Sequence, residues 1–103
     1  MAQAFLKVVA GARQGFNVSL STDAPLVIGR KRGDLLLDDP LVSSTHAQIV
    51  VRNDGWAIQD LGSTNGTLVD GRLVREAPLR PGSAIASGNP RLVLFVGWED
   101  AAE

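Results

Sequence analysis

The chain reads VSSTHA over residues 42–47 and DLGSTNGT over residues 60–67, with IGR upstream at residues 28–30. The three segments supply G-R, then S-x-x-H, then G-S-T-N-G-T, in that order. Each segment alone is a weak signal, because Asn-Gly is a common turn and single serines often bond their own backbone in loops. In combination they indicate one site formed by three loops.

Length and composition set the class of protein. The 103 residues are 45% hydrophobic and 20% charged, which is typical of one globular domain. We expect a single domain over residues 1–103, with its core over about 5–96 and a C-terminal tail over 97–103. The formal net charge of −1 gives no overall attraction to nucleic acid or acidic membranes.

Several classes of site are excluded by residues that the sequence lacks. It has no cysteine, so disulfides, thiol catalysis and thiolate metal sites are absent. No apolar run approaches the ~20 residues that a membrane span needs, so we expect no membrane insertion. The N-terminus lacks the basic and apolar pattern of a signal peptide, and a cytoplasmic setting is the expectation.

The spacing of breakers and β-branched residues predicts an all-β fold. Glycine and proline interrupt the chain often, and the longest stretch without either, residues 41–54, contains Ile49-Val50-Val51. No segment shows a 3.6-residue apolar stripe. We therefore expect ten or eleven short strands in a sandwich of two antiparallel sheets. The expected strands are 5–10, 16–21, 25–29, 35–37, 45–52, 56–61, 66–69, 72–74, 83–87 and 91–96.

Three tight turns are predicted between these strands. Asn53-Asp54-Gly55 and Asp70-Gly71 favour hairpins, because Asp and Gly tolerate positive φ. Gly88-Asn89-Pro90 is expected to turn the chain between the last two strands.

The polar residues of the three segments have the chemistry that a phosphate monoester requires. Such a group carries about −1.5 to −2 charges and three acceptor oxygens. Arg30 offers a forked cation and Ser43 a hydroxyl, and Asn65 can bond a peptide C=O and N–H at once. Taken singly, these residues favour the plainer interpretations, namely a solvated arginine, a turn serine and an Asn-Gly turn.

The order and spacing of the motifs resemble the forkhead-associated (FHA) domain, a module that binds phosphothreonine. The resemblance covers roughly residues 5–96 and implies an eleven-stranded β-sandwich. It implies that the phosphopeptide contacts are Arg30, Ser43, Ser44, Thr64 and Asn65. The matching structural positions are Gly29, His46, Gly62 and Gly66, and the only histidine, His46, is expected to tie the serine loop to a neighbouring loop.

One loop departs from the family pattern. Only Lys31-Arg32-Gly33 separates Arg30 from Asp34, where family members often have one residue more. Lys31 and Arg32 make this loop more basic, and we expect them to contact residues that flank the phosphothreonine. The loop would favour acidic flanking residues or a second phosphate.

The function that the resemblance implies is phosphothreonine-dependent recruitment of a protein phosphorylated by a serine/threonine kinase. The alternative is a phospho-independent scaffold or assembly domain on the same fold, for example in a secretion system. We expect no cofactor, no metal and no nucleic-acid partner, and the oligomeric state stays open with a monomer as the default.

An enzyme is the third interpretation, and the residues argue against it. Ser43, His46 and Asp60 might be cast as a hydrolase triad, but the chain has no G-x-S-x-G elbow. Serine and histidine three positions apart on an extended segment point to opposite faces. His46 with Asp38 and Asp39 would also make a poor metal site.

Overall fold

The computed structural model describes residues 2–52 and 55–98, and this part of the chain forms eleven strands and no helix. The strands are β1 (Ala2–Ala10), β2 (Asn17–Ser19), β3 (Leu26–Gly29), β4 (Leu35–Leu36), β5 (Ala47–Arg52), β6 (Gly55–Asp60), β7 (Thr67–Val69), β8 (Arg72–Val74), β9 (Glu76–Leu79), β10 (Ala84–Ser87) and β11 (Arg91–Trp98). The predicted all-β fold is confirmed, and the ten expected strands all occur, with ends within three residues of their expected positions.

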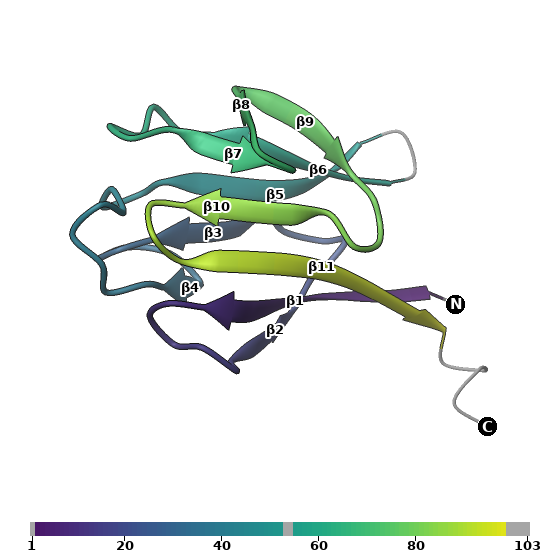
Figure 1. The fold of residues 1–103 in the computed structure, drawn as a ribbon. Coiled ribbons are helices and arrows are strands. Elements are labelled where there is room, and N and C mark those ends of the chain that lie inside the picture. Colours follow the sequence, from purple (N-terminus) through teal and green to yellow (C-terminus); the bar gives the residue numbers. More distant parts are fainter. Residues whose placement is uncertain (1, 53–54, 99–103) are drawn as a thin grey trace.

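The strands form two sheets that pack as a sandwich (Figure 1). One sheet has six strands in the order β2-β1-β11-β10-β7-β8, and the other has five in the order β4-β3-β5-β6-β9. Every pair is antiparallel except β3 and β4, which run parallel and so depart from the expected antiparallel sheets. The parallel pair arises because residues 30–34 loop back beside β3 and bring Leu35 opposite Ile28.

That return loop depends on a glycine. Gly33 has a φ of 135°, in the region that favours glycine, and a Cβ there would lie 2.6 Å from the Val27 carbonyl oxygen. The Asp34 N–H donates to this same oxygen at 2.8 Å. The loop is therefore held tightly against the strand from which it leaves.

Aliphatic side chains fill the space between the sheets. Leu6 and Val8 on β1 are fully buried while Lys7 between them is exposed, which is the alternation of a strand with one buried face. The largest fully buried apolar side chains are Leu6, Ile28, Leu35, Leu37, Ile49, Ile58, Ile85, Leu92, Val8 and Val42. Burying one such side chain contributes about 1.5–3 kcal/mol, so this core supplies the rigid base for the loops.

The strand β9 was missing from the sequence prediction. It contains Pro78, which argues against a strand because proline donates no backbone hydrogen bond. The structure places β9 at the edge of the five-stranded sheet, paired only with β6, with Pro78 opposite Ala57. An edge strand tolerates proline because only one of its sides must pair.

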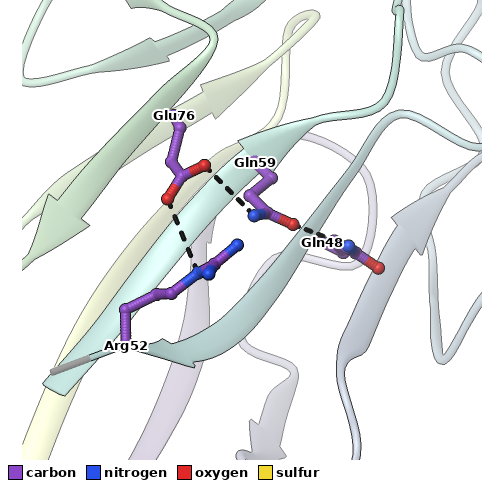
Figure 2. A network of polar contacts seen from close by, with 4 residues as sticks. All are labelled: Gln48, Arg52, Gln59 and Glu76. Atoms are coloured by element: carbon purple, nitrogen blue, oxygen red, sulfur yellow. Dashed lines mark hydrogen bonds and ion pairs between the residues drawn. The ribbon is translucent and has the colours of Figure 1, made fainter. Parts of the chain in front are cut away.

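A polar ladder on the outer surface of β5, β6 and β9 fixes the register of this edge (Figure 2). The Gln48 Nε2 donates to Gln59 Oε1 at 2.7 Å, and the Gln59 Nε2 donates to Glu76 Oε1 at 3.1 Å. Arg52 pairs with Glu76 at 3.6 Å. Cross-strand pairs of this kind contribute roughly 0.2–1 kcal/mol each, enough to favour one register over a slipped one.

Two of the predicted turns are present. Asp70 and Gly71 both have positive φ, at 50° and 84°, and they connect Val69 to its partner Arg72. Residues 88–90 connect β10 to β11 as expected. The turn predicted at Asn53-Asp54-Gly55 lies largely outside the described residues.

The motif segments lie in connections and at the adjoining strand ends, at one end of the sandwich (Figure 1). The connections that follow β3 and precede β5, and those between β6 and β7 and between β10 and β11, gather at the left of the view, whereas β1 begins and β11 ends at the right. The scaffold thus brings segments far apart in sequence to one end.

Candidate functional site

Two of these connections enclose a shallow pocket of about 290 Å³ with one wall from the end of β3. It is lined by Arg30, Pro40, Leu41, Val42, Ser43, Ser44, Thr64 and Asn65. All five residues expected to contact a phosphopeptide are in this lining, so the structure brings them together. Lys31 and Arg32 are exposed beside the pocket and do not line it. The binding role of these residues stays a prediction.

Backbone hydrogen bonds hold the pocket wall that carries Arg30 in place. The Arg30 N–H donates to the Ser43 carbonyl at 2.9 Å, and the N–H groups of Lys31 and Arg32 both donate to the Ser44 carbonyl, at 3.3 and 3.0 Å. Gly29 makes this approach possible, because a Cβ there would lie 2.2 Å from the carbonyl oxygens of both Arg32 and Ser44. Gly29 is therefore required for close packing of backbone on backbone.

The Arg30 guanidinium has an unusual environment. Its Nε is buried, and no described residue accepts a hydrogen bond from it. Most buried donors are paired, and an unpaired one costs about 1–3 kcal/mol. The described residues therefore leave this donor of Arg30, a residue that lines the pocket, without an acceptor.

The imidazole of His46 joins two loops. It is fully buried, its Nδ1 accepts the Ser43 N–H at 3.1 Å, and its Nε2 lies 2.8 Å from the Gly66 carbonyl oxygen. A carbonyl only accepts, so Nε2 carries the proton and the ring is the neutral tautomer. The geometry is the one that a structural role for His46 requires.

Two further hydrogen bonds connect the same loops at the pocket rim. The Thr64 N–H donates to the Ser43 Oγ at 3.0 Å, and the Asn65 Nδ2 donates to the Leu41 carbonyl at 3.0 Å. Ser43 retains its hydroxyl hydrogen as a donor, and Asn65 retains its Oδ1 and one N–H. The side chains are thus oriented while part of their hydrogen-bonding capacity is left for a ligand.

Asp60 holds the shape of the connection between β6 and β7, the glycine-flanked loop, which runs from Gly62 to Gly66. Its Oδ2 accepts the N–H groups of Gly62 and Ser63, each at 3.0 Å, and its Oδ1 accepts the hydroxyls of Ser63 and Thr67. The Ser63 Oγ in turn accepts the Gly66 N–H at 3.0 Å. Partial burial acts to raise the pKa of Asp60, but the hydrogen bonds from Ser63, Thr67 and Gly62 outweigh it, and the pKa lies below its ordinary value.

Sequence reasoning missed this role of Asp60, Ser63 and Thr67. The available signal was an Asp two residues before a glycine and three before a serine, a spacing at which carboxylates often accept local backbone N–H groups. The sequence had suggested Asp60 only as a third member of a triad. Both ring nitrogens of His46 contact backbone groups instead, so the structure does not form that triad.

Other kinds of site find no support in the described residues. His46 reaches the backbone N–H of Ser43 and not its hydroxyl, so no base is placed to activate that serine. Within residues 2–52 and 55–98, no group of three or more His, Asp or Glu side chains is placed to hold a metal ion. Nor does this part of the chain contain a helix long and apolar enough to cross a membrane.

Comparison with known proteins agrees with this geometry. A protein-family model described as the FHA domain matches residues 26–88, a stretch that includes the whole pocket lining. The chain belongs to the FHA domain family.

Individual FHA proteins are similar over most of the chain. The FHA domain-containing protein FhaB of Mycobacterium tuberculosis is 37% identical over 92 residues, which cover 87% of this chain and 59% of FhaB. The chain therefore spans somewhat more than half the length of this relative.

Solved FHA structures superpose closely. The FHA domain of the CT664 protein from Chlamydia trachomatis has a TM-score of 0.84 and 31% identity, covering 90% of this chain and 96% of that one. An FHA domain solved in work on phosphothreonine-dependent FHA domain interactions has a TM-score of 0.81 and 29% identity, covering 90% and 95%.

Replacing His46 with alanine should destabilise this FHA domain. The change removes both hydrogen bonds and leaves a cavity, for an expected loss of about 2–4 kcal/mol in the free energy of unfolding. Urea denaturation followed by tryptophan fluorescence measures it. Leu73→Ala is the matched control, since Leu73 is 71% exposed. An unchanged urea midpoint for His46→Ala would contradict the bridging role.

Asp60→Asn should reveal the charge of this carboxylate in the pH dependence of stability. A lowered pKa means that ionised Asp60 stabilises the fold above its ordinary pKa of 3.8, and that this contribution is lost as pH falls through the lower folded value. The stability difference between wild type and Asp60→Asn should be largest near neutral pH and shrink at acidic pH. Urea titrations at several pH values test this, and a difference that grows on acidification would disprove it.

Proposed function

We propose that this FHA domain is a phosphothreonine-dependent binding module that recruits a protein phosphorylated by a serine/threonine kinase. One observation carries the proposal: a single pocket collects Arg30, Ser43, Ser44, Thr64 and Asn65, and the guanidinium there has a buried donor without a partner. The similarity to an FHA domain studied for phosphothreonine-dependent interactions supports it.

The geometry suggests how each residue acts on the phosphate. Arg30 supplies charge and forked donors to the phosphate oxygens. The hydroxyls of Ser43 and Thr64 add neutral donors, and these two residues are already held in place by the bond from the Thr64 N–H to the Ser43 Oγ. Because the donors are positioned before a ligand arrives, binding loses little entropy in ordering them.

The remaining residues would read the peptide. Asn65 has one amide hydrogen bonded to Leu41 and keeps an acceptor and a donor for peptide backbone. Ser44 lies next to Ser43 in the same rim. Pro40, Leu41 and Val42 give the pocket an apolar side, against which the γ-methyl of phosphothreonine would pack and phosphoserine would not.

The same features support a binding module over an enzyme. Ser43 has no base, and the hydrogen bonds of His46 and Asp60 are directed at loop backbone and hydroxyl groups. We further propose that the chain acts as one domain, centred on residues 5–96, in the cytoplasm, where protein kinases and their substrates meet. A phospho-independent scaffold on this fold would not need the positioned donors.

Arg30→Ala should abolish most phosphate-dependent binding. It removes a charge-assisted contact of the class worth about 1.5–3 kcal/mol, or roughly ten- to a hundredfold in Kd. A degenerate phosphothreonine peptide library, the matched phosphoserine library and their unphosphorylated counterpart, titrated by fluorescence anisotropy, give the measurement. Arg72→Ala, an exposed arginine outside the pocket, is the control.

The outcomes of this titration separate the two functions. Binding lost in Arg30→Ala but kept in Arg72→Ala, with phosphoserine weaker than phosphothreonine, supports the proposal. Failure of the folded wild-type domain to bind any of these libraries would reject it in favour of the scaffold.

Binding should also weaken in mild acid. The phosphate loses its second charge below about pH 6, and its attraction to Arg30 falls with it. Calorimetric titration of one phosphothreonine peptide between pH 7.5 and about pH 5 would show the loss. Thermal melting at each pH controls for unfolding, and a Kd that does not change over this range would count against recognition of the dianion.

A further inference from the structure

The loop between β3 and β4 carries three consecutive cations with two different environments. Arg30 is half-buried and lines the pocket, whereas Lys31 and Arg32 are exposed and lie outside it. The backbone N–H groups of Lys31 and Arg32 nevertheless both donate to the carbonyl of Ser44, a lining residue. The two outer cations are therefore anchored next to the phosphate pocket by bonds that do not involve their side chains.

No cation of this loop forms an ion pair among the described residues. Within residues 2–52 and 55–98, the only ion pair joins Arg52 and Glu76 on the outer surface of the five-stranded sheet. Of the acidic residues that follow the loop, Asp38 is exposed and pairs with no cation in the described part of the chain, and Asp34 and Asp39 bond neutral donors. Asp34 accepts the Val27 N–H at 2.9 Å, and Asp39 accepts the Leu41 N–H and the side-chain amide of Asn89.

The shape of the loop is accounted for by backbone contacts and not by the side chains of Lys31 and Arg32. Gly29 and Gly33 shape the loop through close backbone contacts, and no side-chain hydrogen bond or ion pair of Lys31 or Arg32 contributes among the described residues. Two exposed cations without an ion pair or a side-chain hydrogen bond among the described residues can meet an anion on a ligand.

Resting on the proposed function, we infer that Lys31 and Arg32 form a second anion subsite that takes a second phosphate group on the same peptide. Adjacent Cα atoms lie about 3.8 Å apart, so the two subsites are separated by only one or two residues of loop. An extended peptide rises about 3.3 Å per residue. The second phosphate therefore belongs within about four residues of the first phosphothreonine.

The chemistry favours phosphate over carboxylate at this subsite. A phosphate carries about twice the charge of a carboxylate and three acceptor oxygens. Two adjacent cations, one of them a forked guanidinium, match that charge and geometry better than they match one glutamate. The domain would thus prefer a segment phosphorylated twice over one phosphorylated once.

The test compares the wild-type domain and its variants on singly and doubly phosphorylated peptides. A second phosphothreonine is moved through positions −4 to +4 around a fixed one, and each Kd is compared with that of the singly phosphorylated peptide. At the best position we expect binding to tighten about tenfold, and substitution of glutamate there to give about threefold at most. In Lys31→Gln/Arg32→Gln the gain should disappear, while the singly phosphorylated peptide loses less than about threefold.

Arg72→Gln/Arg80→Gln is the matched control, because it removes the same number of charges from exposed positions outside the pocket. It should keep the tenfold gain. The subsite is disproved if no position of the second phosphate tightens binding, if the gain survives in Lys31→Gln/Arg32→Gln, or if glutamate matches phosphate. Failure of the proposed function itself is distinct, since then no singly phosphorylated peptide would bind.

Discussion

The site depends on the buried imidazole of His46. Through Nδ1 it holds the backbone of Ser43, and through Nε2 it holds the carbonyl of Gly66, so one ring sets the distance between the two loops that form most of the pocket. The bonds from the Thr64 N–H to the Ser43 Oγ and from Asn65 to the Leu41 carbonyl are possible only because the loops already lie at that distance. Since both ring nitrogens bond backbone groups, these two bonds do not depend on the side chains that line the pocket.

The wall of the pocket that carries Arg30 is held in place by backbone packing. Gly29 lets the backbone of residues 30–32 pack directly against that of Ser43 and Ser44, with no room for a Cβ. Backbone contacts of this kind are stiffer than side-chain contacts because they have no rotamers to change. The loops are irregular, yet the strands, the imidazole and this close approach give them a defined shape, which lowers the entropic cost of binding.

The sequence predicted the pocket better than it predicted the interactions beneath the pocket. Arg30, Ser43 and Asn65 were recognisable because they lie in short motifs whose residue types match phosphate chemistry. The parallel pairing of β3 with β4 was not predictable, because it depends on how residues 30–34 fold back. The strand β9 was not predicted because it contains Pro78. Proline is acceptable there only because β9 lies at the edge of its sheet, which the tertiary structure alone shows. Asp60 was visible as a residue, but its role rests on four donors that converge only when the loop is formed.

Charge, and not size, decides which hollow suits an anion. A hollow of about 630 Å³, larger than the proposed pocket, lies along the same glycine-flanked loop and is lined by Asp60, Gly62, Ser63, Gly66, Leu73, Val74 and Arg75. The carboxylate of Asp60 would repel a phosphate there, and Arg75 is its only cation. The smaller pocket has Arg30 in its lining, no acidic residue, and a basic loop beside it. Asp60 accepts the N–H groups of Gly62 and Ser63, so its negative charge is directed at donors of the loop, whereas Thr64 and Asn65 line the smaller pocket.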